Sequence, residues 1–188
     1  MGWSTHHRNG LIYYAPQRSY RGYTLLTSSR GTDAYLIDME GLICHRWHLE
    51  DGISYGFLLP NGHLLMRTNP PVGGEARNKG ARTAVGSVIE LDWDGNQVWS
   101  YCNPMVHHDF ARLPNGNTLV LVFEEIPDEL AAQVKGGIVD DDVTEPMLGD
   151  AVYEVAQTGG IVNTWRSWEH LNVDEDIICF LENRYEWT

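Results

Sequence analysis

The sequence predicts an all-β fold, a β-propeller built from four-stranded blades, and two repeated turn motifs are the basis for this prediction. Leu-Pro-Asn-Gly occurs at 59–62 and again at 113–116, and an Asp-x-(Glu/Asp)-Gly turn occurs at 38–41 and again at 92–95. Both motifs recur after 54 residues, so two unlike patterns share one period. A shared period indicates a duplicated unit, and units of this length with short strands and tight turns are typical of propeller blades.

Each unit is predicted to contain two linked hairpins. Apolar and polar residues alternate around the turns, as half-buried strands require, and glycine supplies the positive φ that hairpin turns need. A third copy of the second turn ends at Gly159, and each of the three copies is followed six residues later by an aromatic side chain: Trp47, Tyr101 or Trp165. We expect these aromatic side chains to pack between blades.

Taken in order, the blades are predicted at about 10–53, 54–107 and 108–170, and residues 171–188 lead into a strand of a further blade. The first blade has a weaker opening hairpin at 20–26. About two and a half to three blades are therefore expected in this chain, whereas closed propellers have about four to eight. We expect the ring to be completed by further sequence, by a complementing C-terminal chain or by self-association.

Two long insertions separate the second and third strands of the later blades, at 69–86 and 124–149. The second contains a predicted short helix at 127–134, which begins with proline, and an acidic run at 140–142. We interpret the acidic run as part of a solvated loop, with cation binding as the alternative. Loops of this length in a compact domain are usually functional or disordered.

The charge balance argues against a polyanionic partner. With 26 Asp and Glu against 13 Lys and Arg, the formal net charge is −13, so the chain lacks the basic surface that nucleic acids require. The sequence shows neither a signal-peptide core nor a stretch long enough for a membrane helix, and we expect a cytoplasmic protein without a membrane partner. Cys44, Cys102 and Cys179 are widely spaced, so we expect reduced thiols in or near the core.

His107 and His108 are the strongest candidates for chemistry. When the two units are aligned on their Pro-Asn-Gly turns, His108 matches Ser54 at the start of the innermost strand. His107 then matches Ile53. In a propeller that strand lines the central channel, and because successive strand residues face opposite sides, we expect His108 to face the channel and His107 to pack between blades or support it from behind. The structural alternative is that His108 is hydrogen-bonded to a neighbouring blade.

Four further residues complete the predicted substrate site. Ser54 is included because it occupies the position equivalent to His108, and His170 is placed as a gate at the channel mouth. Trp168 and Trp187 lie outside the regular repeat, so either is a candidate platform for stacking a substrate. A histidine suits proton transfer, nucleophilic attack and metal ligation alike, and the sequence leaves these roles open.

Two segments carry a resemblance to a known family. His-His-Asp at 107–109 is followed by Leu-Pro-Asn-Gly-Asn at 113–117, and a hairpin at 88–99 reads Val-Ile-Glu-Leu-Asp-Trp-Asp-Gly-Asn-Gln-Val-Trp. With these motifs the chain, from about residue 22 to 165, resembles the arylsulfotransferase family of β-propellers. The resemblance implies a six-bladed fold that transfers a sulfuryl group from one phenol to another through a sulfated histidine, with no nucleotide donor and no cofactor.

The resemblance also implies roles for particular residues. His108 matches a histidine that contacts the sulfuryl group in the channel, and the sulfated histidine, a His-x-Asn pair and an arginine are expected on later blades. The substrate would be a small aromatic anion, and histidines would neutralise the charge that develops on the sulfuryl oxygens. By itself the chain is expected to be inactive.

Two other functions stay open from the sequence. In the first, His108 and other channel histidines hold a divalent transition metal that activates water, which would make the protein a hydrolase or a lyase. In the second, the protein is a non-enzymatic propeller whose insertions bind another protein, because propeller folds serve catalysis and binding alike.

Overall fold

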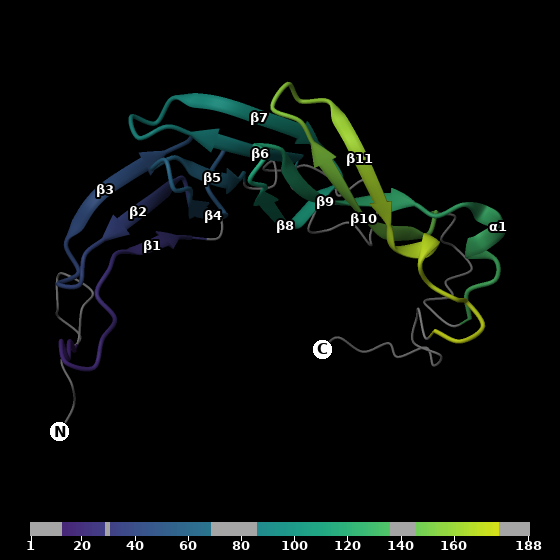
Figure 1. The fold of residues 1–188 in the computed structure, drawn as a ribbon, viewed down its shortest axis with the longest axis horizontal. Coiled ribbons are helices and arrows are strands. Elements are labelled where there is room, and N and C mark those ends of the chain that lie inside the picture. The colour runs from purple at the N-terminus through teal and green to yellow at the C-terminus, as the bar shows by residue number, and fades with distance from the viewer. Residues whose placement is uncertain (1–12, 29–30, 69–85, 136–145, 177–188) are drawn as a thin grey trace. The chain divides into compact units, whose positions relative to one another are not determined.

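The computed structural model describes residues 13–28, 31–68, 86–135 and 146–176. Within these ranges the chain forms three antiparallel sheets and two short helical segments (Figure 1). By its contacts the chain divides into two compact units, which are residues 1–72 with 87–100, and residues 73–86 with 101–188. The all-β prediction is confirmed at this level, and a closed ring of blades is not shown within the described ranges.

The first sheet has three strands in chain order: β1 (Thr24–Thr27), β2 (Asp33–Ile37) and β3 (Ile43–His48). Asp38 closes the turn between β2 and β3, because its carboxylate accepts hydrogen bonds from two backbone N–H groups of the turn at 3.0 and 2.8 Å. Gly41 in the same turn has a φ of 79°, the left-handed conformation that favours glycine. This sheet has one strand fewer than the other two, in keeping with the weak opening hairpin of the first unit.

The second sheet is a four-stranded meander, in which each strand pairs with the next one along the chain. Its strands are β4 (Tyr55–Leu58), β5 (Leu64–Arg67), β6 (Gly86–Leu91) and β7 (Gln97–Asn103). Both predicted turns form, since Gly62 has a φ of 85° between β4 and β5 and Gly95 has a φ of 86° between β6 and β7. Two linked hairpins therefore make one sheet, as the repeat predicts.

Apolar side chains of the first and second sheets form one core within the first unit. Trp47 is 1% exposed, and its indole Nε1 donates a 2.9 Å hydrogen bond to the carbonyl oxygen of Asp92. The prediction that Trp47 packs between neighbouring sheets is confirmed. The buried members of this core are Ala34, Leu36, Trp47, Ile53, Leu64, Met66, Ile89 and Leu91.

The third sheet belongs to the second unit and is again a four-stranded meander (Figure 1). Its strands are β8 (Val106–Arg112), β9 (Thr118–Glu125), β10 (Leu148–Val155) and β11 (Ile161–Arg166). Gly116 and Gly159 both have a φ of 87° in the two tight turns, at the positions that the repeat predicts. Its buried apolar residues are Val106, Phe110, Val120, Val122, Ala151 and Val155.

The second insertion is shorter than the predicted range of 124–149. The β9–β10 ladder pairs Leu148 with Glu125 and Gly149 with Glu124, so both ends of the predicted insertion belong to the sheet. The sequence pattern underestimates the strands because Glu124, Glu125 and Gly149 are unfavourable in strands, and only the partner strand shows that they continue the ladder.

The helix predicted after β9 is confirmed as α1 (Asp128–Ala131), and a 3-10 turn, η2 (Ser167–Glu169), follows β11. The predicted insertion at 69–86 lies outside the described residues, apart from Gly86, which begins β6. The acidic run at 140–142 also lies outside them. Among the described helices, none has the length and apolar character that crossing a membrane requires.

The prediction of buried thiols is wrong for two of the cysteines. Cys44 and Cys102 are free, but both are exposed. They lie on β3 and β7, where alternate side chains point away from the buried face of the sheet. Cys179 lies outside the described residues.

Candidate functional site

The histidine pair lies in an irregular stretch of β8. Beyond Phe110, an unbroken ladder with β9 would pair His108 with Val122. Val106 pairs with Val122 instead, so His107, His108 and Asp109 lie opposite the single residue Leu121, and β8 has two additional residues in this stretch. A bulge of this kind disrupts the ladder locally, bends the strand and re-aims side chains, and bulges are frequent next to active sites.

His108 has a backbone conformation that most residues avoid. Its φ is 47°, and it is the one non-glycine residue with a positive φ in the described part of the chain. For an L-amino acid the left-handed conformation costs roughly 1–2 kcal/mol, although histidine adopts it more often than most side chains do. Strained backbone clusters at functional sites, where the surrounding structure holds it in place. The side chain of His108 is exposed.

His107, by contrast, occupies a core position. It is 2% exposed, and its ring stacks on that of Phe123, with centroids 3.7 Å apart and planes inclined by 14°. The equivalent residue of the duplicated unit, Ile53, is 0% exposed, so this position is buried in both sheets. A polar ring where the other copy has a hydrocarbon side chain needs polar partners to offset its desolvation.

Polar groups lie near both nitrogens of His107, although the contact between Nε2 and Asp150 is an ion-pair distance without hydrogen-bond geometry. Nε2 lies 3.3 Å from Oδ1 of Asp150, and Nδ1 lies 2.9 Å from Nδ1 of His108. Asp150 reaches this position because the β9–β10 ladder places it opposite Phe123, on which the His107 ring stacks. The contacts therefore run from a carboxylate, through a buried imidazole, to an exposed imidazole.

The order of these contacts indicates one tautomer for each ring. A carboxylate only accepts hydrogen bonds, so we assign a proton to Nε2 of His107, which faces Asp150. Nδ1 of a neutral His107 is then an acceptor, and it takes the hydrogen bond that Nδ1–H of His108 donates. The lone pair of His108 is left on Nε2. That atom is able to take up a proton or to attack an electrophile.

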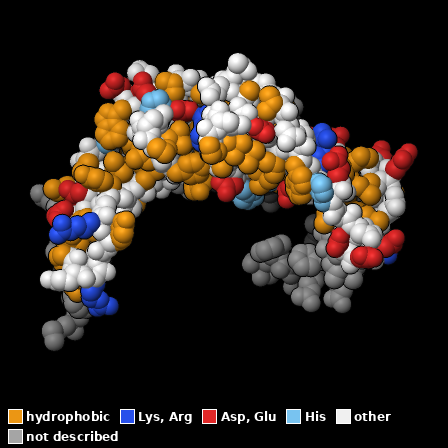
Figure 2. Space-filling view, in the orientation of Figure 1, with side chains coloured by type: hydrophobic (Ala, Val, Ile, Leu, Met, Phe, Trp, Pro, Cys, Tyr) orange, Lys and Arg blue, Asp and Glu red, His pale blue; other side chains and the backbone are white. Residues whose placement is uncertain are grey.

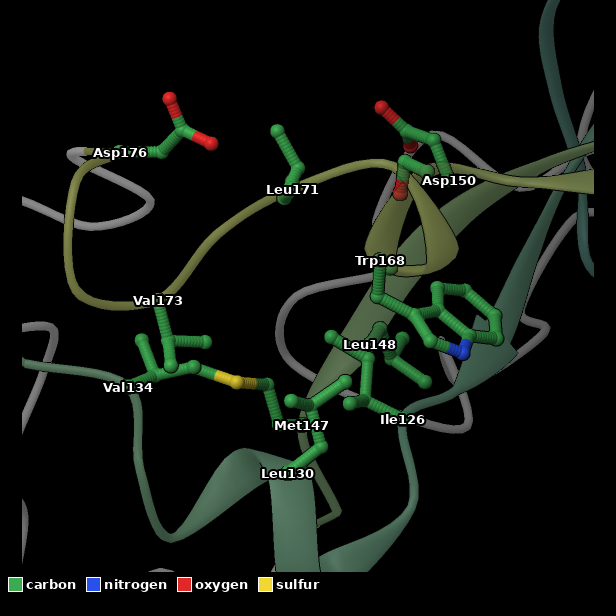
Figure 3. Close-up of a pocket in the computed structure, with 12 residues that line it drawn as sticks. Ile126, Leu130, Val134, Met147, Leu148, Asp150, Trp168, Leu171, Val173 and Asp176 are labelled. Carbon is green, nitrogen blue, oxygen red and sulfur yellow. The ribbon is translucent and has the colours of Figure 1, made fainter.

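A pocket of about 340 Å³ lies beside Asp150 in the same unit (Figure 3). It is enclosed by α1, the first residues of β10, η2 and the segment that follows η2. The carboxylates of Asp150 and Asp176 lie apart along one side, with Leu171 between them, and the indole of Trp168 lies beside Leu148 and Ile126 (Figure 3). The apolar lining includes Ile126, Leu130, Val134, Met147 and Leu148.

A glycine makes room for Trp168. A Cβ atom added to Gly149 would lie 2.6 Å from Cε3 of Trp168 and 3.0 Å from Cγ1 of Ile126. The first distance is far shorter than two carbon atoms tolerate, so a larger residue at this position would displace the indole. Adjacent positions of β10 therefore hold the glycine against which Trp168 packs and the aspartate that contacts His107.

The surroundings of the pocket are acidic. Figure 2 shows Asp and Glu side chains gathered at the end of the third sheet that carries α1. The nearby cations already have carboxylate partners, since Lys135 lies 3.4 Å from Asp174 and Arg166 lies 2.6 Å from Glu124. The residues that line the pocket include no lysine or arginine.

The other predicted substrate residues do not all join this site. Ser54 belongs to the first unit, where its hydroxyl lies within hydrogen-bond distance of the carbonyl oxygens of Arg67 and Thr68, at 3.2 and 3.1 Å. Trp187 lies outside the described residues. The role predicted for Ser54 stays a prediction.

Two predicted residues lie near each other in the second unit. His170 is exposed and stacks on Trp165, with ring centroids 4.8 Å apart and planes inclined by 7°. Trp168, two residues earlier, lines the pocket that includes Asp150. Of the aromatic platforms that the sequence suggests, Trp168 thus lines the same pocket as Asp150, which also contacts His107.

A further polar cluster, which the sequence reasoning missed, joins three strands of the third sheet. Arg166 on β11 donates a 2.6 Å hydrogen bond from Nε to Glu124 on β9, and the hydroxyl of Tyr153 on β10 donates to the same carboxylate. Tyr153 and Arg166 are 29 and 42 residues from Glu124 in the sequence, so no local sequence pattern predicts the cluster.

This cluster keeps Glu124 negatively charged on β9, the strand that pairs with β10. Burial alone would raise the pKa of Glu124, but the hydrogen bonds from Arg166 and Tyr153 and the charge of Arg166 outweigh it and hold that pKa below its ordinary value. Burial and the hydrogen bond to Glu124 raise the pKa of the Tyr153 hydroxyl, which therefore stays protonated. At neutral pH the cluster is an ion pair with a neutral phenol bound to it.

Within the described ranges, no group of three or more His, Cys, Asp or Glu side chains is arranged to hold a metal ion. Of the described histidines outside β8, His48 contacts two carboxylates, Asp33 and Glu50, and the others contact one carboxylate or aromatic rings. In the first unit His63 Nδ1 lies 2.7 Å from Glu90, and His45 stacks on Trp93 with centroids 3.9 Å apart. Among the described histidines, the exposed His108 is the one with a positive φ.

No protein-family model matches the chain, and no curated protein matches it. Among solved structures, the chain is similar to a protein of unknown function from Bacteroides caccae, with 14% sequence identity and a TM-score of 0.45. The similarity covers 78% of this chain and 41% of that one, so the chain spans less than half the length of that structure. The functional inference therefore rests on the motifs and on the geometry of the site.

Proposed function

We propose that the third sheet carries part of the active site of an arylsulfotransferase-like β-propeller enzyme, which moves a sulfuryl group between phenolic compounds. The meander sheets, their repeated turns and the resemblance of residues 107–117 to that family support this proposal. The observation that carries it is the bulge at His107 and His108. It contains two histidines that align with isoleucine and serine in the duplicated unit, and one of these histidines is exposed.

In the proposed reaction, His108 accepts the proton of the acceptor phenol. The phenol O–H bond breaks and its proton moves to Nε2 of His108. The phenolate oxygen forms the new bond to sulfur, while the bond between sulfur and its previous carrier, a sulfated histidine on another blade, breaks. The imidazolium formed on His108 then offsets the negative charge on the sulfuryl oxygens.

His107 and Asp150 are positioning residues in this scheme. The negative charge of Asp150 favours a proton on Nε2 of His107, and in that tautomer Nδ1 of His107 accepts the hydrogen bond from Nδ1–H of His108. Both contacts therefore favour a lone pair at Nε2 of His108. Such a chain from carboxylate to imidazole orients a base without itself contacting the substrate.

The proposed site needs residues from other blades. Propellers have about four to eight blades, so the three sheets would be part of one ring. The sulfated histidine, the His-x-Asn pair and the arginine that the resemblance implies would come from blades of the same polypeptide or of a partner. The donor would be a small aromatic sulfate.

The test is a sulfuryl-transfer assay on the protein as its source cell produces it. A chromogenic aryl sulfate and a phenol acceptor are supplied, and release of the coloured phenol is followed. We expect the His108→Ala variant to lose at least about 100-fold in rate, the scale of a missing general base. The control is His48→Ala, because His48 lies on β3 and pairs with Asp33. No phenol release, or equal release by the His108 variant, would contradict the proposal.

The same preparation tests the metal alternative. Metal content is measured before and after dialysis against a chelator, and the transfer assay is repeated. Activity that survives metal removal supports histidine-based transfer. Activity that disappears with the metal and returns with an added divalent ion would instead support the hydrolase or lyase alternative, in which His108 is a ligand.

A further inference from the structure

We propose that the pocket beside Asp150 is a second, non-reacting site for an aromatic ligand that carries an alkylammonium group, which Asp176 recognises. The choice of a phenol as the aromatic part rests on the proposed function. The ammonium part rests on the pocket alone, because it follows from the charges and the shape of the lining.

The pocket fits a ligand with one aromatic ring. Its volume of about 340 Å³ is near the lower end of the ~300–1,000 Å³ range of small-molecule sites. Side chains from α1 and β10 make it apolar, and the indole of Trp168 offers a flat surface for a ring to stack on (Figure 3). A hydrocarbon or aromatic body is therefore the part of the ligand that the walls favour.

Charge complementarity selects a cation for the other part. Asp150 and Asp176 are the charged groups of the lining, and no lysine or arginine joins them. Lys135 and Arg166, which lie in the same unit, are already paired with Asp174 and Glu124. An anionic ligand would meet uncompensated like charge here, whereas an ammonium group would form a charge-assisted hydrogen bond.

The two carboxylates have different surroundings, and this orients the ligand. Asp150 lies 3.3 Å from Nε2 of His107, so the end of the pocket that it marks is the end near the histidine pair. Asp176 lies at the other end, beyond Leu171 (Figure 3). Its Oδ2 accepts a 2.7 Å hydrogen bond from the backbone N–H of Asn172, which fixes the carboxylate within its turn. The ammonium is thus directed toward Asp176 and the aromatic ring toward Trp168.

The experiment compares three ligands that share one phenol ring and differ in charge. Tyramine is cationic, 4-ethylphenol is neutral and 3-(4-hydroxyphenyl)propanoate is anionic, and calorimetry measures their binding to the full chain at low ionic strength. We expect tyramine to bind at least about 10-fold more tightly than 4-ethylphenol, and the propanoate to bind most weakly. Added salt should narrow the difference.

Two pairs of variants locate the binding. Asp176→Asn should remove the preference for tyramine and leave binding of 4-ethylphenol unchanged, whereas Glu175→Gln, which removes the same charge one residue away from the lining, should not. Gly149→Ala should weaken all three ligands, because the added Cβ displaces Trp168. Gly160→Ala is its control, since a Cβ there has no neighbour within 4 Å.

The outcomes separate this inference from the proposed function. Equal binding of tyramine and 4-ethylphenol, or a tyramine preference that persists in Asp176→Asn, would overturn the inference even if sulfuryl transfer to simple phenols is found. Asp176-dependent binding of tyramine without any sulfuryl transfer would support the ammonium site and contradict the proposed function.

Discussion

Position 107 shows at the residue scale what distinguishes the two copies of the repeat. Ile53 and His107 occupy equivalent positions and are both buried, yet one is a hydrocarbon and the other an imidazole. Packing alone is satisfied by isoleucine, so the imidazole is not required for burial of the strand. Its nitrogens lie near Asp150 and His108, and in the proposed reaction it connects that carboxylate with the exposed base.

The substitution His107→Ile tests this role with a residue that the chain itself uses at the equivalent position. We expect the free energy of unfolding to stay within about 1 kcal/mol of the wild type or to rise, because a buried polar group is replaced by an apolar one. The transfer rate should nevertheless fall, and its pH profile should shift, because His108 loses the acceptor that fixes its tautomer. Urea unfolding and pH–rate measurements check the two parts. An unchanged pH profile would show that His107 only fills space.

The sequence predicts some residues of the site and misses others. His107, His108 and Trp168 are recognisable because they depart from the repeat or lie outside it. Asp150 is not recognisable, since its approach to His107 depends on the β9–β10 register, which is set across a long insertion. Glu124 was assigned to that insertion for the same reason. A side chain placed by a distant strand leaves no local signal.

At the element scale, the tight turns are far more predictable than the strand irregularity. Gly62 and Gly116 adopt the expected positive φ because a turn of this type needs a residue without a Cβ, which is a local requirement. The bulge of β8 is different, because it is defined only against its partner: Val106, rather than His108, pairs with Val122. The sequence therefore predicts the hairpins but not the two additional residues in this strand.

The ion pair across β9, β10 and β11 makes stability of the third sheet depend on pH. The pKa of Glu124 is lowered in the folded state, so its contribution is present above its ordinary pKa of about 4.5 and is lost as the pH falls through the folded value. We expect Glu124→Gln to cost about 1–2 kcal/mol at pH 7, a modest value because Arg166 is 36% exposed. Urea unfolding between pH 7 and pH 3 should show this difference shrinking below about pH 4.5.

A neighbouring variant controls for the general loss of a negative charge. Glu125→Gln removes an exposed carboxylate from the same strand, and its cost should be small and nearly constant over that range. A cost of Glu124→Gln that does not change with pH would mean that the carboxylate is not held by its charged partner.

At the scale of the whole molecule, each unit has its own buried apolar residues. Trp47 is a buried member of the core of the first unit, whereas Val120 and Val122 are buried in the second unit. The fold class can be predicted from the sequence because the repeat period and the turns are local properties that recur in every repeat. The number of blades does not follow, because a period states the size of one blade and not how many surround an axis.

Trp47→Phe tests whether the cores are energetically separate. The variant loses the hydrogen bond from Nε1 to the carbonyl of Asp92 and part of the indole packing, so we expect a cost of about 2 kcal/mol or more. Hydrogen exchange should rise in β2, β3 and β6, with little change in β9 and β10. Equal loss of protection in all three sheets would show that the two units unfold together.

The copy 54 residues upstream has Ile53 and Ser54 in place of the two adjacent histidines, and this has a consequence for how the chain can change over generations. A mutation introduces a reactive side chain into one repeat, while the other repeat keeps the apolar residue that packing requires. Ancestral reconstruction of the repeat therefore asks whether the histidines arose before or after the duplication. The two orders predict different residues in the common precursor at the position that became Ile53 and His107.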